Sequence, residues 1–203
     1  MDPSSIVVIG ASAGGVGALQ ALVPQLDRSL PTAWCAVLHV DAHRSEMPGL
    51  LTRAGGMPAV HVESGQRLRT GCFYLAPPDL HFMVEDSHAV LSRGPRENWT
   101  RPAIDPLFRS AAAAFGPRCI GVVLTGNLGD GAAGLLAIKQ ANGVAVVQDP
   151  REAEFSAMPR SALRHVAVDH CVRLAAMPAL LNGLVQSTAD LRRPARVLGE
   201  GHA

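Results

Sequence analysis

A serine with the surroundings of a nucleophile lies near the N-terminus. The segment Gly10-Ala11-Ser12-Ala13-Gly14 fits the pattern G-x-S-x-G, and it separates a short apolar run from a helical pattern. At such a strand-to-helix turn, a serine is held at the C-terminal edge of a sheet. The backbone amides of Ala13 and Gly14 would lie at the helix N-terminus, where unpaired N–H groups stabilise an oxyanion. The segment therefore predicts Ser12 as a nucleophile.

Two other interpretations of this glycine-rich segment stay open. A loop that binds a phosphate or nucleotide also uses glycines and a helix N-terminus. The spacing of Gly10, Gly15 and Gly17 differs from G-x-G-x-x-G, but His39 and Asp41 end the next expected strand, where a dinucleotide site would need a polar residue. The third interpretation is a structural turn without chemistry.

A serine hydroxyl needs a base before it can attack a carbonyl carbon. Of the eight histidines, His39 directly follows the second expected parallel strand, 34–38. The carboxyl ends of parallel strands meet at one crevice, so we expect His39 to lie near Ser12. The alternation of His39, Asp41 and His43 also fits metal ligands. No fourth ligand is evident, and we expect no metal.

Asp130 is the strongest candidate for the group that orients the imidazole. It follows another buried run and precedes a helical pattern, so it would reach the same crevice. An aspartate at that place is also a common helix N-cap. The order Ser…His…Asp differs from that of α/β-hydrolases, so their fold is not assumed. Spacing alone leaves four rivals to Asp130, namely Asp41, Asp79, Asp105 and Asp149.

The elements that must position these residues alternate along the chain. Short apolar runs predict strands that are buried on both faces, at 6–9, 36–38, 120–124 and 144–147. Helical patterns lie between or before them, at 16–26, 47–53, 104–115 and 132–140. This alternation predicts an α/β fold with a doubly wound, mostly parallel sheet. Residues 59–93 instead have the pattern of strands joined by tight turns, and the turn Asp86-Ser87 predicts an antiparallel hairpin at one edge of that sheet.

Composition limits the classes of function. The chain has 203 residues, which predicts one domain, and its net charge of +1 argues against nucleic-acid binding. No apolar run approaches the roughly 18 residues of a membrane span, and the N-terminus does not have the pattern of a signal peptide. The four cysteines are far apart, which is typical of reduced, buried side chains. We therefore expect a cytoplasmic protein without membrane insertion.

Several motifs in order resemble the catalytic domain of CheB-type chemotaxis methylesterases. They are 9–15, 74–77, 101–105, 107–110, 123–126, 129–134 and 158–160. The resemblance covers residues 5–186, which leaves 187–203 as an expected disordered tail. It implies a parallel α/β sheet with an antiparallel hairpin. It also implies a Ser-His-Asp triad, which falls on Ser12, His39 and Asp130.

The resemblance further implies an activity and partners. Members of the family hydrolyse glutamate methyl esters on methyl-accepting chemotaxis receptors and deamidate certain receptor glutamines, and they need no cofactor. The alternative is a divergent signalling or binding module that keeps the fold but acts on another ester or only binds a partner.

Three departures from the family pattern bear on these expectations. The resemblance begins at residue 5, with no receiver domain before it, so activity would be constitutive or controlled by a separate receiver protein. Asn127-Leu128 replaces Met-Gly in a loop that would contribute an oxyanion donor, which makes Asn127 a candidate for that role. Residues 40–43 replace the usual Met-Pro-rich turn after His39.

Overall fold

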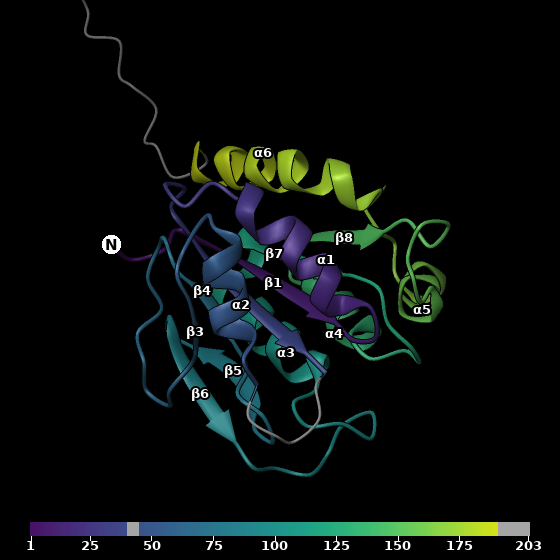
Figure 1. The fold of residues 1–203 in the computed structure, drawn as a ribbon, viewed down its shortest axis with the longest axis horizontal. Helices are drawn as coiled ribbons and strands as arrows, with labels where there is room; N and C mark the ends of the chain where they lie inside the picture. The colour runs from purple at the N-terminus through teal and green to yellow at the C-terminus, as the bar shows by residue number, and fades with distance from the viewer. Residues whose placement is uncertain (40–44, 191–203) are drawn as a thin grey trace, which may run out of the picture.

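A seven-stranded parallel sheet forms the centre of the fold. The structure, a computed structural model, describes residues 1–39 and 45–190 (Figure 1). The strands stand in the order β3-β4-β2-β1-β7-β8-β9, and each pairs in parallel with its neighbours. Their bounds are β1 (Ser5–Ala11), β2 (Thr32–Leu38), β3 (Ala59–His61), β4 (Phe73–Leu75), β7 (Cys119–Val123), β8 (Val144–Gln148) and β9 (His170–Val172).

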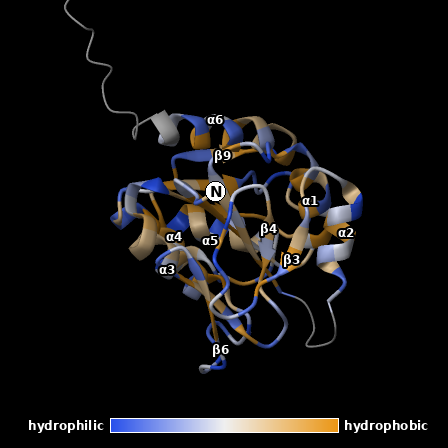
Figure 2. Ribbon diagram, turned by 90° about the vertical axis from the view of Figure 1, so that its left-hand side faces the viewer, coloured by the Kyte–Doolittle hydropathy of each residue, from blue (hydrophilic) through white to orange (hydrophobic). Residues whose placement is uncertain are grey.

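Helices cover both faces of this sheet, which confirms the doubly wound α/β class. One face packs against α3 (Ile104–Phe115), α4 (Ala132–Gln140) and α5 (Ala157–His165). The other packs against α1 (Gly15–Leu22), α2 (Met47–Ala54) and α6 (Met177–Asp190). In Figure 1, α1 and α2 lie in front of β1 and α3 lies behind it. Figure 2 shows orange, hydrophobic strands between helices that carry blue, hydrophilic residues on their outer sides.

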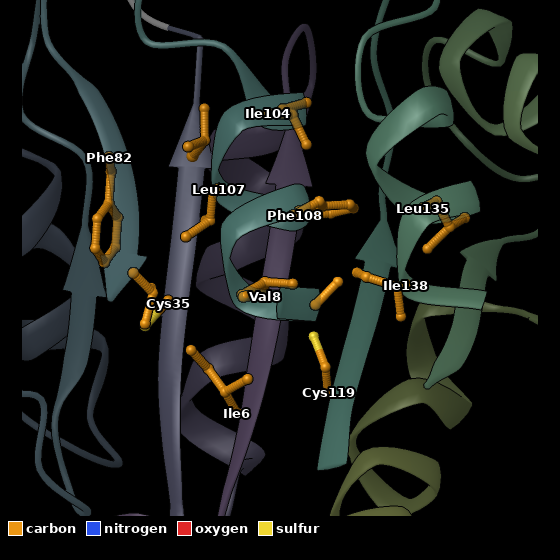
Figure 3. Packing of buried hydrophobic residues seen from close by; sticks show 14 of the residues in the cluster. Ile6, Val8, Cys35, Phe82, Ile104, Leu107, Phe108, Cys119, Leu135 and Ile138 are labelled. Atoms are coloured by element: carbon orange, nitrogen blue, oxygen red, sulfur yellow. The ribbon is translucent and has the colours of Figure 1, made fainter. Parts of the chain in front are cut away.

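The central strand β1 divides its side chains between two cores. Ile6 and Val8 belong to the cluster with α3 and α4, whereas Val7 and Ile9 belong to the cluster on the opposite face. All four side chains are fully buried, which is why this strand is a continuous apolar run in the sequence. Figure 3 shows the first of these clusters, in which side chains of α3 and α4 point onto the strands.

Helix α3 crosses close to the carboxyl end of β1. A Cβ atom at Gly10 would lie 2.5 Å from Cγ2 of Ile104, the first residue of α3, so only glycine fits at this place in β1. The close packing brings the N-terminus of α3 to the edge of the sheet where Ser12 leaves β1.

The predicted hairpin is present, but it forms a sheet of its own. Strands β5 (His81–Glu85) and β6 (His88–Ser92) are antiparallel, and Asp86 and Ser87 turn with φ of 45° and 63°. The described part of the chain contains no ladder between this pair and the seven-stranded sheet, so the hairpin does not extend it. It is held instead by α3, where Ser110 Oγ accepts a hydrogen bond from the Val84 amide (3.0 Å).

Other differences from the expected elements have local causes. Strands β3 and β4, expected in an antiparallel region, pair in parallel with the main sheet. The first helix ends at Leu22 and continues as a 3₁₀ turn, Val23–Gln25, that contains a proline. Strand β9 and helices α5 and α6 have no counterpart among the elements expected from the sequence.

Helix α6 also changes the expected C-terminal boundary. It continues to Asp190, so residues 187–190 are helical and do not belong to a tail. The Thr188 hydroxyl donates to the Leu184 carbonyl (2.7 Å) within this last turn. The rest of the expected tail, 191–203, lies outside the described residues. Of the helices in the described ranges, none combines the length and the apolar character that crossing a bilayer requires.

Candidate active site

The candidate site lies where the order of the strands changes direction. From β1 the chain first adds β2 on one side, and it later returns to add β7 on the other. Ser12 follows β1, His39 follows β2, and Asp130 lies in the loop between β7 and α4. In open α/β sheets, the crevice beyond the carboxyl ends of such strands is the usual ligand site.

The backbone around Ser12 is fixed by the neighbouring loop. The Ser12 amide donates to the Thr125 carbonyl (3.0 Å), and the Thr125 hydroxyl donates to the Ala13 carbonyl (3.0 Å). Gly14 adopts a left-handed conformation (φ 74°) at the start of α1. Within the described residues, the amides of Ala13 and Gly14 have no hydrogen-bond acceptor, so both N–H groups are available as oxyanion donors.

The loop after β7 touches Ser12 directly. A Cβ atom at Gly126 would lie only 2.8 Å from Cβ of Ser12, and the Gly126 amide is already bound to the Phe155 carbonyl (2.9 Å). The next residue, Asn127, is exposed, and its amide has no acceptor in the described part of the chain. Asn127 thus follows the residue that forms the wall of the site, and its role as an oxyanion donor stays a prediction.

His39 is brought to Ser12 by the register of two strands. Ala11 pairs with Leu38, and the His39 amide donates to the Ala11 carbonyl (3.0 Å). Parallel strands lie about 4.8 Å apart, so Ser12 and His39 leave the sheet as neighbours. Among the described residues, no hydrogen bond joins the Ser12 hydroxyl to His39. Such catalytic contacts are often long without substrate.

The His39 imidazole contacts Asp130. Its Nε2 lies 2.9 Å from Oδ2 of Asp130, with the histidine side chain 18% and the aspartate 3% exposed. This contact joins residues that are 91 positions apart in the sequence.

Asp130 also caps a helix, although not the one that follows it. Oδ2 accepts a hydrogen bond from the amide of Ile104 (2.7 Å) and Oδ1 from that of Asp105 (3.2 Å), the first two residues of α3. Oδ1 further accepts from the Gly131 amide (2.9 Å) and from Asn98 Nδ2 (2.7 Å). Asp130 thus caps α3 and not α4, for which the sequence had offered it as a cap, and the same side chain contacts His39.

These contacts keep Asp130 ionised. Burial by itself would raise its pKa, but hydrogen bonds from His39 and from the Ile104 amide outweigh that effect, and the pKa lies below its ordinary value. An ionised carboxylate only accepts hydrogen bonds, so Nε2 of His39 carries the proton that it donates. The other nitrogen, Nδ1, is then free to take up a proton.

A second buried carboxylate lies beside Asp130. Asp105 is 5% exposed and accepts from the Gly134 amide (2.6 Å) and from Asn98 Nδ2 (2.8 Å). Burial raises the pKa of Asp105, and the neighbouring Asp130 charge adds to that rise. Asn98 was not among the residues predicted from the sequence, where its only signal is a polar segment before α3.

The remaining rivals to Asp130 have other partners. Asp79 pairs with Arg101 (2.7 Å) and Asp149 with Arg151 (2.7 Å). Asp41, together with the rest of 40–44, lies outside the described residues. The described ranges contain no group of three or more His, Cys, Asp or Glu side chains placed to hold a metal ion.

Comparison with known proteins identifies the family of this chain. Residues 7–181 match the family described as CheB methylesterase. The chain belongs to the CheB methylesterase family. The crystal structure of the Thermotoga maritima CheB methylesterase catalytic domain superposes with a TM-score of 0.84 at 26% identity, over 90% of this chain and 98% of that one.

Two relatives show how the family members differ in length. A candidate protein-glutamate methylesterase/protein-glutamine glutaminase of Leptospira interrogans is 37% identical over 92% of this chain and 97% of its own length. Protein-glutamate methylesterase/protein-glutamine glutaminase 2 of Anaeromyxobacter dehalogenans is 36% identical over 89% of this chain, but over only 53% of its own length. The CheB-family domain thus matches one relative along nearly its whole length and the other along about half.

Proposed function

We propose that this CheB-family chain is a serine hydrolase that removes methyl esters from glutamate side chains of chemoreceptors. The observation that carries the proposal is the contact between His39 Nε2 and Asp130 Oδ2, beside the turn that holds Ser12. The names of the relatives support the same substrate class. A methylated receptor protein is the proposed partner, and the cytoplasm is the proposed place of action.

The proposed reaction has two halves. The Ser12 hydroxyl attacks the ester carbonyl carbon while its proton moves to Nδ1 of His39. Free amides at Ala13 and Asn127 would stabilise the oxyanion. The intermediate collapses as the methoxy group takes the proton from His39 and leaves as methanol, so the glutamyl group remains on Ser12. His39 then takes a proton from water, whose oxygen attacks the acyl carbon. The bond to Ser12 Oγ breaks, His39 returns the proton to that oxygen, and the glutamate leaves.

The same residues would also deamidate a glutamine side chain. Ammonia then replaces methanol as the leaving group, and both reactions pass through the same acyl intermediate. We therefore propose glutaminase as a second activity of this site, consistent with the paired activities in the relatives' names.

Methanol release from a methylated chemoreceptor tests the proposal. We expect release by the wild-type chain, and a loss of at least about 1,000-fold in Ser12→Ala, because nothing else in the proposed mechanism supplies the nucleophile. Full activity in Ser12→Ala would refute the assignment of the nucleophile. Binding of the receptor by the wild type with no release of methanol or ammonia would favour a binding module instead.

A further inference from the structure

A loop residue outside the proposed triad joins the two buried carboxylates of the site. Asn98 Nδ2 donates to Oδ2 of Asp105 (2.8 Å) and to Oδ1 of Asp130 (2.7 Å). An amide group carries two hydrogens, and this arrangement uses one for each carboxylate. In the described part of the chain, no other side chain donates to both acids.

The bridge opposes a repulsion that the fold creates. Asp105 and Asp130 are 5% and 3% exposed, so water screens their charges poorly. Two close carboxylates repel each other when both are ionised, and hydrogen-bond donors between or around them reduce that repulsion. Backbone amides serve each acid separately, whereas the Asn98 amide is shared, so it stabilises the ionised form of both at once.

The bridge also fixes the rotation of the Asp130 carboxylate. Oδ1 faces Asn98 and the Gly131 amide, and Oδ2 faces the Ile104 amide and His39. Without Asn98, Oδ1 keeps, among the described residues, only the backbone donors of Asp105 and Gly131, so the carboxylate is held less firmly with Oδ2 directed at the imidazole.

The loop around Asn98 is built to hold that amide in place. Asn98 has a left-handed backbone (φ 51°), which asparagine tolerates better than most residues. The residue before it, Glu97, pairs with Arg109 of α3 (2.7 Å), and its carbonyl accepts from the Thr100 amide (3.0 Å). The loop is therefore tied to the same helix that Asp130 caps.

We propose that Asn98 is a positioning residue that orients Asp130 toward His39 and keeps it ionised during ester hydrolysis. The proposal rests on the function proposed above. Asn98 contacts neither Ser12 nor His39 through any described hydrogen bond, so its effect on the reaction passes through Asp130.

Two variants and one control test this role. Asn98→Gly removes both hydrogen bonds and keeps the left-handed backbone accessible. Asn98→Asp keeps the shape but places a third carboxylate against the other two. The control is Asn142→Gly, because Asn142 is exposed, is also left-handed (φ 62°) and follows the end of α4 opposite to Asp130.

We expect kcat for methanol release to fall about 10- to 100-fold in Asn98→Gly, with KM within about twofold, because the lost contact is to a charged group that acts on the chemical step. The loss is partial because Asn98 and Asp105 border a hollow of about 330 Å³ from which water can replace the amide. The loss of kcat in Asn98→Asp should be at least as large, and kcat of Asn142→Gly should equal that of the wild type. A kcat within twofold of the wild type in Asn98→Gly, or an equal loss in Asn142→Gly, would overturn the role of Asn98.

A spectroscopic measurement separates this proposal from the proposed function. The His39 ring N–H that faces Asp130 should give a downfield proton NMR signal, identified by its absence in His39→Gln. We expect the signal to move or broaden in Asn98→Gly and to stay unchanged in Asn142→Gly. If the wild type releases no methanol, the proposed function fails, and the NMR comparison alone decides whether Asn98 orients Asp130. An unchanged signal in Asn98→Gly would then overturn the inference.

Discussion

Removal of the Asp130 carboxylate should destabilise the fold as well as impair the proposed reaction. The side chain is 3% exposed and accepts five hydrogen bonds. In Asp130→Ala, the amides at the start of α3 lose their acceptor where water has little access, and Asn98 loses one of its two. A residue that only assisted catalysis would show no such effect on stability.

The size of the effect follows from these contacts. A hydrogen bond to a charged group contributes about 1.5–3 kcal/mol, and the favourable charge at a helix N-terminus adds about 0.3–1 kcal/mol. The bonds share one carboxylate and are not additive, and the variant no longer buries a charge. We expect the free energy of unfolding to fall by about 3–5 kcal/mol, the range typical of breaking a buried charged network.

Urea denaturation at pH 7 measures this loss. The matched control is Ser12→Ala, whose hydroxyl makes no hydrogen bond in the described structure and which should change stability by less than about 0.5 kcal/mol. Asp130→Asn keeps one acceptor oxygen, so its loss of unfolding free energy should lie between those of Ser12→Ala and Asp130→Ala. A loss below about 1 kcal/mol in Asp130→Ala, no larger than that of Ser12→Ala, would refute the capping argument.

The pH dependence of this difference gives a second check. The fold lowers the pKa of Asp130, so its contribution is fully present above the unfolded value of about 3.9 and is lost as the pH falls through the folded value. The stability gap between wild type and Asp130→Ala should therefore narrow below about pH 4. A gap that widened on acidification would contradict the direction of the shift.

Three further variants probe the surroundings of the site. Gly126→Ala places a Cβ atom against the Met158 sulfur and 2.8 Å from Cβ of Ser12, so the loop must shift and methanol release should fall at least about tenfold. Unchanged release would show that the loop and Met158 move aside freely. Leu128→Gly should raise the free energy of unfolding in urea by about 0.5–1 kcal/mol, because Leu128 has a φ of 64° and is 70% exposed, so glycine relieves strain without loss of packing. A decrease in that free energy would argue against backbone strain at this position. In Arg151→Ala, carboxyl NMR should show the pKa of Asp149 rising from about 2 toward its ordinary 3.8, because the side-chain hydrogen bonds of Arg151 that lower it most are gone, whereas its backbone amide still donates. An unchanged value would contradict that cause.

The strands and the first two site residues could be predicted because their signals are local. A strand buried on both faces must be apolar at every position, as 6–9 is, and a turn from such a strand into a helix limits where Ser12 can lie. His39 could be predicted for the same reason, since it directly follows the neighbouring strand. The family resemblance added the triad as a set.

Local patterns could not select among the candidate aspartates as they selected Ser12 and His39. Spacing left Asp105 and Asp130 as rivals, and the tertiary structure places both in one buried network with different roles. Asn98 gave no chemical signal in the sequence, because its two hydrogen-bond partners are 7 and 32 positions away. The separation of the hairpin from the main sheet could not be predicted for the same reason, because the hairpin packs on α3 and does not pair with a strand of that sheet.

Local patterns therefore predict the α/β alternation, the serine turn and the strand that His39 follows, because periodicity and chain direction act over a few residues. The packing of distant segments sets which carboxylate contacts the histidine, which amides that carboxylate accepts from and which side-chain amide lies between the two acids. Those contacts depend on how α3 packs across the end of β1, where Gly10 leaves room for Ile104.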